Sequence, residues 1–243
     1  MRRVVVTGAN RGLGLEFARQ LAAAGDEVVA TARHPKTADD LNKLASTSGG
    51  RVSVVRLDIG DPSDLEAAAL HVGERFDAVD VLINNAGIWM APDQPDRASS
   101  GPLADLRPDA VTEVLRINAV GPLAVTQALA PLLAAAGEAV VLNISSWLGS
   151  LEGAARQGAR SNLAYGMSKA ALNMLTLRLA AELAAQGTIV VSMSPGWVAT
   201  DMGGPSAPLE PPESVKGMLN VLDALTPAQS GTFLDHAGAV MPW

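Results

Sequence analysis

Apolar and polar residues along the chain follow two alternating patterns. Short runs of branched apolar residues, typical of strands buried on both faces of a sheet, are separated by longer segments whose apolar residues recur every three or four positions, as in helices. The short runs lie at residues 3–7, 27–31, 52–57, 79–83, 139–144, 188–193 and 231–235. This alternation predicts an α/β fold, a single doubly wound (Rossmann) sheet of about seven parallel strands with helices on both faces.

The helical segments carry their own start and stop signals. Gly25 ends the first helix, and Asp61-Pro62 supplies an N-cap aspartate and a proline at the first helical position of another. Long helices with apolar faces are expected at 109–136 and 163–186, and a further helix at 213–224. Residues 91–108 are rich in Pro, Asp, Ser and Gly and predict a surface loop.

The composition limits the class of protein. With 243 residues, 48% of them hydrophobic, and no linker or repeat, we expect one domain spanning residues 1–243. The net charge of −7 and the lack of a basic tract argue against nucleic acid or an anionic membrane as the main partner. Without cysteine, disulfide and thiolate chemistry are excluded. His34, His71 and His236 lack the spacing of metal ligands, so no metal is expected. We see no signal peptide and no span of ~20 apolar residues, which makes a cytoplasmic protein the default expectation.

A glycine-rich loop joins the first strand to the first helix. It reads Thr7-Gly8-Ala9-Asn10-Arg11-Gly12-Leu13-Gly14. Glycines allow a tight turn and a close approach of the backbone to a pyrophosphate, while the helix N-terminus offers free N–H groups and the positive end of its dipole. Placed between a strand and a helix, the loop predicts a dinucleotide-binding site.

The residue at the end of the second strand predicts which dinucleotide binds. Folds that prefer NAD usually place an acid there to bind the ribose 2′-hydroxyl, but here the position is Arg33. Arg11 in the glycine loop supplies a second cation, and two arginines can clamp a 2′-phosphate. NADP(H) is therefore favoured over NAD(H); the alternative is that both arginines are simply solvated.

Tyr165 and Lys169 lie four residues apart at the start of an unbroken helical pattern. Positions i and i+4 share one face of a helix, so the lysine ammonium can reach toward the phenol. A free phenol has a pKa near ~10, and a nearby cation lowers it, which makes tyrosine a usable proton donor and acceptor. The alternative is a partly exposed tyrosine beside a surface lysine.

The spacing Thr-Gly-x-x-x-Gly-x-Gly, together with Tyr-x-x-x-Lys, resembles the short-chain dehydrogenase/reductase family, and the resemblance spans nearly the whole chain. Asp201-Met-Gly-Gly-Pro and the ending Met241-Pro242-Trp243 look most like the branch that contains sniffer-type and C-factor-type proteins. The resemblance implies the catalytic residues Asn118, Ser146, Tyr165 and Lys169. It also implies the cofactor-binding residues Gly8, Asn10, Arg11, Gly12, Leu13, Gly14, Arg33, Asp58, Ile59, Asn85, Ala86, Gly87, Tyr165, Lys169, Pro195, Gly196, Val198 and Thr200.

Particular roles also follow from the resemblance. Asp58 accepts a hydrogen bond beside the adenine, Ser146 rather than Ser145 carries the catalytic hydroxyl, and Asn118 distorts its helix and holds a water that leads to Lys169. A kink before a proline is the other explanation of Asn118. Tyr165 lies 19 residues after Ser146, a longer separation than in most members. The added residues, around 152–161, contain Arg156 and Arg160 and are expected near the mouth of the pocket.

The function implied is hydride transfer between NADP(H) and a carbonyl or alcohol carbon, with Tyr165 as proton donor and acceptor. The alternative is a non-catalytic regulatory or signalling protein that binds NADP(H). A sugar-nucleotide epimerase is disfavoured because it would be expected to carry a larger C-terminal substrate domain. The substrate pocket is expected in the C-terminal half, and the substrate is not identified. A homodimer or homotetramer is expected by analogy. Five large residues either line an apolar pocket or belong to the core: Trp89, Trp147, Trp197, Met167 and Met202.

Overall fold

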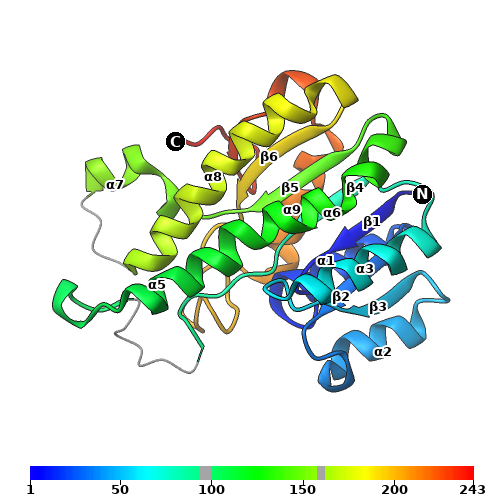
Figure 1. Ribbon diagram of the computed structural model, residues 1–243, viewed down its shortest axis with the longest axis horizontal. Helices are drawn as coiled ribbons and strands as arrows, with labels where there is room; N and C mark the ends of the chain where they lie inside the picture. The colour runs from blue at the N-terminus through cyan, green and yellow to red at the C-terminus, as the bar shows by residue number, and fades with distance from the viewer. Residues whose placement is uncertain (93–99, 158–161) are drawn as a thin grey trace.

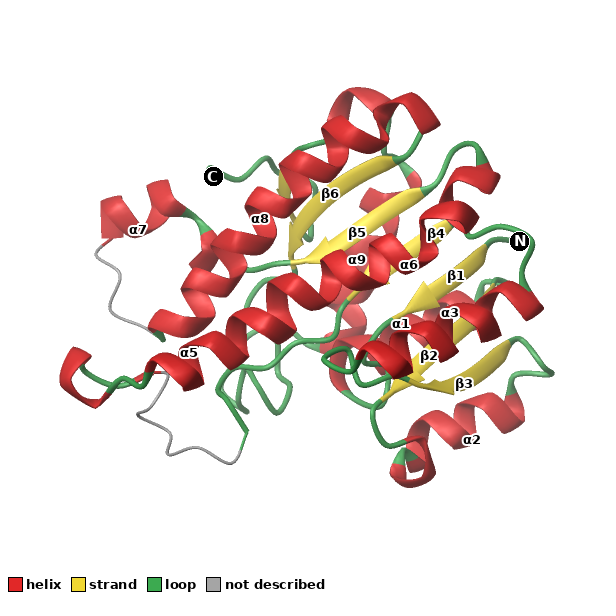
Figure 2. Ribbon diagram, viewed as in Figure 1, coloured by secondary structure: helices red, strands yellow, loops and turns green. Residues whose placement is uncertain are grey.

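The computed structural model describes residues 1–92, 100–157 and 162–243, and it contains one seven-stranded sheet between two layers of helices (Figures 1 and 2). Every pair of neighbouring strands is parallel. The predicted fold class is confirmed. Part of the predicted surface loop, residues 93–99, lies outside the described residues.

The strands run in the order β3-β2-β1-β4-β5-β6-β7. The chain therefore builds the sheet outward from β1 in one direction, then returns and builds outward from β4 in the other. Such a reversal leaves a crevice at the carboxyl ends of the two central strands, where doubly wound folds bind their ligands. The strand bounds are β1 Arg3–Val6, β2 Glu27–Ala32, β3 Val52–Arg56, β4 Val81–Asn84, β5 Val140–Ile144, β6 Ile189–Ser194 and β7 Phe233–Asp235.

The helices cover both faces. Their bounds are α1 Gly12–Ala23, α2 Asp39–Thr47, α3 Pro62–Arg75, α5 Pro108–Leu115, α6 Gly121–Ala136, α7 Leu151–Gln157, α8 Leu163–Leu183 and α9 Pro211–Asp223. Short 3-10 turns (η1, η2, η4, η5 and η6) lie at 35–37, 103–105, 147–149, 184–186 and 227–229. The Asp61 side chain accepts from the N–H of Ser63, which is the cap predicted for α3. Helices α2 and α7 were not anticipated from the sequence.

Two apolar cores lie on opposite faces of the sheet. Alternate strand residues point to opposite faces, so Val4 and Val6 face one core and Val5 faces the other. The first core packs against α1, α2 and α9 through residues such as Phe17 and Met218. The second packs against α3, α6 and α8 and includes Phe76, Leu129, Leu133, Leu179 and Leu183. In Figure 1, α6 and α8 run side by side across the sheet.

The longest apolar helical run corrects one expectation from the sequence. Residues Pro108–Ala136 form a continuous helical run through α5, the π turn η3 (Arg116–Val120) and α6. By length and composition alone it is apolar enough to cross a membrane, the one such helix in the described part of the chain. A core helix passes the same test, and this run packs against α3, α8 and β4. Packing explains part of its composition, since 39% of the apolar window is buried.

Candidate active site

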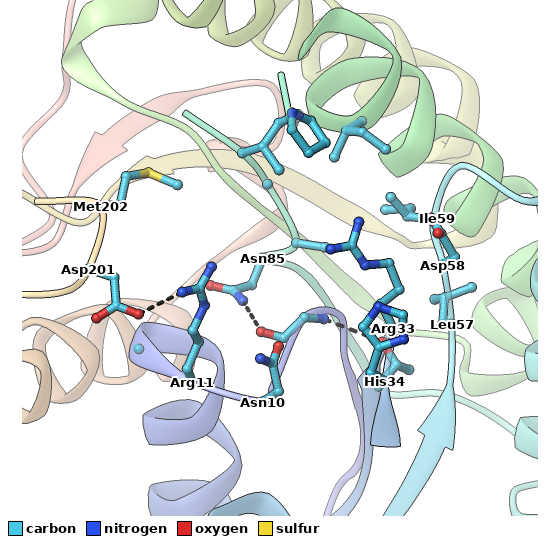
Figure 3. Close-up of a pocket in the computed structure, with 18 of the residues that line it drawn as sticks. Asn10, Arg11, Arg33, His34, Leu57, Asp58, Ile59, Asn85, Asp201 and Met202 are labelled. Carbon is cyan, nitrogen blue, oxygen red and sulfur yellow. Dashed lines mark hydrogen bonds and ion pairs between the residues drawn. The ribbon is translucent and has the colours of Figure 1, made fainter. Parts of the chain in front are cut away.

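A cavity of about 520 Å³ opens at the carboxyl ends of the central strands (Figure 3). It is the crevice that the strand order predicts. Of the predicted cofactor-binding residues, the following line it: Gly8, Asn10, Arg11, Gly12, Leu13, Arg33, Asp58, Ile59, Asn85, Ala86, Gly87 and Thr200. Sequence reasoning missed others that line it: Thr31, His34, Thr37, Ala38, Leu57, Ile88, Pro92, Glu113, Arg116, Ile117 and Asp201.

The glycine loop packs directly on the turn that follows β4. A Cβ placed on Gly8 would lie 2.8 Å from the Cα of Ala86, and one on Gly14 would lie 2.3 Å from the carbonyl oxygen of Gly8. Both contacts are closer than a side chain allows, so glycine is required. Asn85 stabilises this close contact between the two turns, since its Nδ2 donates to the carbonyls of Thr7 (2.9 Å) and Gly8 (3.0 Å). Gly14 thus belongs to the support beneath the cavity and does not line it.

The first turn of α1 can receive an anion. The helix begins at Gly12, its N-cap residue Arg11 makes no side-chain capping bond, and no acidic residue lies in its first turn. Its leading N–H groups and the positive end of its dipole are therefore available beside the cavity. This arrangement fits a pyrophosphate.

The two arginines predicted to bind a 2′-phosphate differ in their contacts. Arg11 Nη1 lies 2.6 Å from Asp201 Oδ2, and both side chains are exposed. Arg33 is exposed and, within the described residues, makes no hydrogen bond or ion pair. Figure 3 shows the two arginines on opposite sides of the cavity. Arg33 is therefore the cation that is free to pair with a phosphate, whereas Arg11 joins the glycine loop to the segment after β6.

Helix α5 and the first residue of the π turn η3 contribute to the cavity wall an ion pair that the sequence did not reveal. Arg116 donates to Glu113 through Nε and Nη2 and, through Nη1, to the carbonyl of Gly60 at 2.7 Å. The Asp58 carboxylate accepts from the N–H of Gly60 at 3.1 Å. Arg116 holds the pKa of Glu113 below its usual range, with Arg33 adding a weaker attraction. The loop carrying Asp58 is thus fixed from two sides.

The two serines after β5 point in different directions. Ser145 is buried, and its hydroxyl donates to Asn173 Oδ1 at 2.7 Å. Ser146 caps the turn η4 by accepting from the N–H of Leu148, and its side chain hydrogen-bonds to Tyr165. Only Ser146 is placed beside the phenol, as the alternation of side chains along a strand leads one to expect.

Tyr165 and Lys169 are both buried, on the first turns of α8. The Lys169 Nζ lies 5.5 Å from the centroid of the Tyr165 ring and donates to the carbonyl of Ile144 at 2.7 Å. Burial raises the pKa of Tyr165 to about 12, although its hydrogen bond to Ser146 acts in the opposite direction. Burial also lowers the pKa of Lys169 to about 8. The expected lowering of the phenol pKa is therefore not found in the chain alone, because loss of hydration outweighs the hydrogen bond with Ser146, and Lys169 is not among the groups that shift this pKa.

Asn118 lies in a π turn, so the predicted local distortion of its helix is confirmed. Its amide is fully buried; Oδ1 accepts from the N–H of Ile88, and Nδ2 donates to the carbonyl of Ile88 and to Ser168 Oγ. A Cβ on Gly87 would lie 3.2 Å from Asn118 Oδ1 and 3.7 Å from Lys169 Nζ. Because Gly87 lines the cavity, Asn118 and Lys169 lie directly behind its wall. Tyr165 and Lys169, which were predicted to bind the cofactor, are not among the residues that line the cavity. The water relay through Asn118 stays a prediction.

Of the four residues after β6 that were predicted to bind the cofactor, only one lines the cavity. Thr200 lines the cavity, but Pro195, Gly196 and Val198 do not. Val198 is buried and forms a bridge to Leu209, while Gly196 adopts a positive φ of 82°. The carbonyl of Pro195 accepts from Ser214 on α9 at 2.7 Å. These residues fold the segment back toward the cavity.

The large side chains of uncertain role separate into two groups. Trp147, Trp197, Met167 and Met202 are between 45% and 54% exposed, so none of them is ordinary core. Met202 also lines the cavity. Trp89 is partly buried against the Tyr165 ring, with ring centroids 4.6 Å apart.

The strand order, the glycine loop and the cavity define a Rossmann-type α/β protein with a nucleotide-binding crevice. The sequence profile described as short chain dehydrogenase matches residues 2–210. The chain belongs to this family. The resemblance stated from the sequence is therefore confirmed.

Relatives of known name agree with this assignment. The C-signal protein of Myxococcus xanthus is 44% identical over 168 residues, which cover 68% of this chain and 93% of the relative. The NADPH-bound carbonyl reductase from chicken fatty liver superposes with a TM-score of 0.90 at 39% identity, covering 100% of this chain and 99% of that one. The carbonyl reductase Sniffer of D. melanogaster gives a TM-score of 0.89 at 31% identity and covers both chains fully, 100% of each. The resemblance to the sniffer and C-factor branch is also confirmed.

Burial of Lys169 should make stability depend on pH. Between its folded pKa of about 8 and its ordinary value of 10.5, the unfolded chain holds a proton that the folded chain has lost. The free energy of unfolding should therefore rise with pH, by at most about 1.4 kcal/mol per pH unit. Tyr165, whose pKa is raised from 10.0 to about 12, acts in the opposite direction above pH 10.0.

We expect Lys169→Met to abolish the rise between pH 8 and pH 10, measured by urea unfolding followed by circular dichroism. The control is Lys43→Met, which removes an exposed lysine of α2 and should keep the wild-type slope. An unchanged slope in Lys169→Met would show that Lys169 keeps its ordinary pKa in the folded chain.

Proposed function

We propose that this protein is an NADP(H)-dependent oxidoreductase that reduces a carbonyl compound or oxidises the corresponding alcohol. One observation carries the proposal: the hydroxyls of Ser146 and Tyr165 lie together with the ammonium of Lys169, and Lys169 lies directly behind Gly87, which lines a cavity suited to a dinucleotide. The similarity to an NADPH-bound carbonyl reductase supports it.

The residues present fit an NADP(H) cofactor. The cavity of about 520 Å³ has the free N-terminus of α1 for the pyrophosphate and the unpaired Arg33 for a 2′-phosphate. Asp58 and Ile59 would hold the adenine, and Thr200 would lie at the nicotinamide end. We keep Pro195, Gly196 and Val198 as proposed backbone contacts to the nicotinamide. When bound, the reduced nicotinamide supplies the hydride.

Ser146 and Tyr165 would act on the substrate oxygen. The Ser146 hydroxyl would donate a hydrogen bond to that oxygen as negative charge develops there. Tyr165 would donate its proton to the same oxygen, and a pKa of about 12 keeps this proton on the phenol at neutral pH. Without cofactor, the phenol of Tyr165 is therefore protonated and can act as a proton donor, which suits reduction of a carbonyl.

Lys169 would hold the ribose next to the nicotinamide and stabilise the phenolate that forms. With a pKa of about 8, its ammonium remains mostly charged at neutral pH. An anionic cofactor nearby would favour the charged form further. Asn118 would keep the backbone of Ile88 in place and, with a water, complete the path of the proton to solvent.

The alternative, a non-catalytic protein that binds NADP(H) and signals, is less well supported. A binding protein needs the glycine loop and Arg33, but it does not need a serine hydroxyl bonded to a buried tyrosine. The juxtaposition of Ser146 with Tyr165 therefore favours catalysis. A tyrosine hydroxyl next to a serine hydroxyl offers a substrate oxygen a proton donor and a second hydrogen-bond donor.

The remaining expectations are proposals that these observations support. The whole chain would form one NAD(P)-binding domain with the substrate pocket in its C-terminal half. A homodimer or homotetramer is suggested by exposed apolar side chains on the π turn, α6 and α8: Val120, Leu123 and Met174. The net charge of −7 disfavours nucleic acid and anionic membranes as partners. We propose a cytoplasmic location for this acidic, cysteine-free protein.

Cofactor preference should depend on Arg33. A hydrogen bond to a charged group contributes about 1.5–3 kcal/mol, so Arg33→Ala should weaken NADPH binding about tenfold or more and leave NADH binding almost unchanged. Isothermal titration calorimetry with both cofactors measures this. The matched control is Lys36→Ala, which removes an exposed cation three residues away that does not line the cavity. If Arg33→Ala keeps the wild-type ratio of NADPH to NADH affinity, Arg33 does not bind the 2′-phosphate.

Turnover should depend on the hydroxyl of Tyr165. Tyr165→Phe keeps the ring and its packing but removes the transferable proton, so kcat should fall about 10²–10⁴-fold. NADPH affinity should stay within a few-fold, since the phosphate and adenine contacts lie elsewhere. Both are measured by NADPH absorbance with a panel of aldehydes and ketones and by calorimetry. Undiminished turnover in Tyr165→Phe would mean that another group donates the proton.

A further inference from the structure

The Trp89 indole lies against the ring of Tyr165. The two ring centroids are 4.6 Å apart, and the ring planes are tilted by 40°. Trp89 follows the turn after β4, whereas Tyr165 lies on α8, so the contact joins segments distant in sequence. Only 7% of Tyr165 is exposed, and Trp89 provides part of this cover.

A single buried amide fixes this contact. The Oδ1 of Asn162 accepts from the N–H of Tyr165 at 3.0 Å, and its Nδ2 donates to the carbonyl of Trp89 at 2.7 Å. Asn162 is only 5% exposed. Capping α8 requires just the acceptor half of this side chain. The donor half is used to hold Trp89, which a helix cap does not explain.

A second asparagine holds the preceding residue in the same way. Asn118 pairs with both the N–H and the carbonyl of Ile88, each at 2.8 Å. The backbone of Ile88 and Trp89 is thus held by amides from two separate elements, the π turn and the start of α8. Buried side-chain amides directed at consecutive backbone groups leave this segment little freedom to move.

We propose that Trp89, held by Asn162, is a positioning residue for Tyr165: it covers one face of the phenol ring, keeps water from it and orients its hydroxyl toward Ser146. The kinetic part of this inference rests on the proposed function, but the shielding of the phenol does not. Trp89 acts through Tyr165 and is assigned no contact with the reacting atoms.

Shielding has a measurable consequence for the ionisation of Tyr165. Burial is the main reason that its pKa is raised, so removing the indole should admit water and lower that pKa. The groups that face the phenol are Ser146, the residue that caps η4, and Lys169 from α8 itself. Among the described residues, no carboxylate contributes to the pKa of Tyr165. A shift caused by loss of Trp89 can therefore be attributed to hydration.

The sequence makes the experiment direct, because Tyr165 is the only tyrosine in the chain. The near-ultraviolet absorbance of tyrosinate then reports this one residue, with far-ultraviolet circular dichroism recorded at each pH to detect unfolding. We expect Trp89→Ala to lower the titration midpoint by about one pH unit or more. Trp89→Phe should lower it less, because it keeps a ring on the phenol.

Two further variants separate positioning from folding. Asn162→Ser keeps a neutral cap for α8 but lacks the amide donor to Trp89, so it should shift the midpoint in the same direction as Trp89→Ala. Trp243→Phe is the matched control, because that indole stacks on the ring of Phe233 and not on that of Tyr165. It should titrate as the wild type does.

Turnover supplies the second readout. We expect kcat to fall about tenfold in Trp89→Ala and to be largely restored in Trp89→Phe, with NADPH affinity unchanged in both. The proposal would be overturned if Tyr165 in Trp89→Ala stayed protonated up to the same pH as in the wild type, or until the protein unfolded. If no variant turns over any carbonyl, the proposed function fails, while the titration still decides whether Trp89 shields Tyr165.

Discussion

The close approach of two turns at the centre of the sheet is the constraint on which the rest of the structure depends. The loop after β1 lies directly on the turn after β4, with Gly8 against Ala86 at a distance that excludes any side chain. The hydroxyl of Thr7 accepts from the N–H groups of both Asn85 and Ala86 at 3.0 Å, so the contact is also satisfied by hydrogen bonds. Because β1 and β4 are where the strand order reverses, this contact forms the floor of the crevice and fixes the N-terminus of α1 beside it.

A ladder of buried polar side chains sets the position of α8 relative to this floor. The side chain of Asn84 on β4 donates a hydrogen bond to Asn143 on β5, and Asn143 donates one to Thr176 on α8. The hydroxyl of Thr176 is in turn hydrogen-bonded to that of Ser192 on β6. A helix packed only through apolar contacts can slide with little cost, but displacing these groups would leave buried donors unpaired. Thr176 lies two helical turns beyond Lys169, so the ladder holds the catalytic face of α8 in register with the ends of β4 and β5.

The sequence was sufficient to predict those features that depend on residues close together along the chain. The strands and helices follow from the period of the apolar residues, and the glycine loop predicts the floor of the cavity. Features that depend on distant contacts were not predictable: the pairing of Arg11 with Asp201, the hydrogen bond from Arg116 to the carbonyl of Gly60, and helix α7, whose Glu152 N–H bonds to the carbonyl of Trp243. The pKa of Tyr165 was misjudged because the spacing to Lys169 is visible in the sequence, whereas burial of the phenol is not. Roles carried over from the family for Ser146 and Asn118 agree with where these residues lie, and their activity remains to be measured.

We propose that this crevice places a nicotinamide next to a carbonyl held by Ser146 and Tyr165. The most direct measurement is to incubate the protein with a panel of aldehydes and ketones and NADPH that carries deuterium at the transferable position of its nicotinamide ring, using each face of the ring in turn. Mass spectrometry of the alcohol product then detects the label. Our account predicts that deuterium from one face alone appears on the carbinol carbon. Tight NADPH binding without transfer to any carbonyl, or label from both faces, would contradict it.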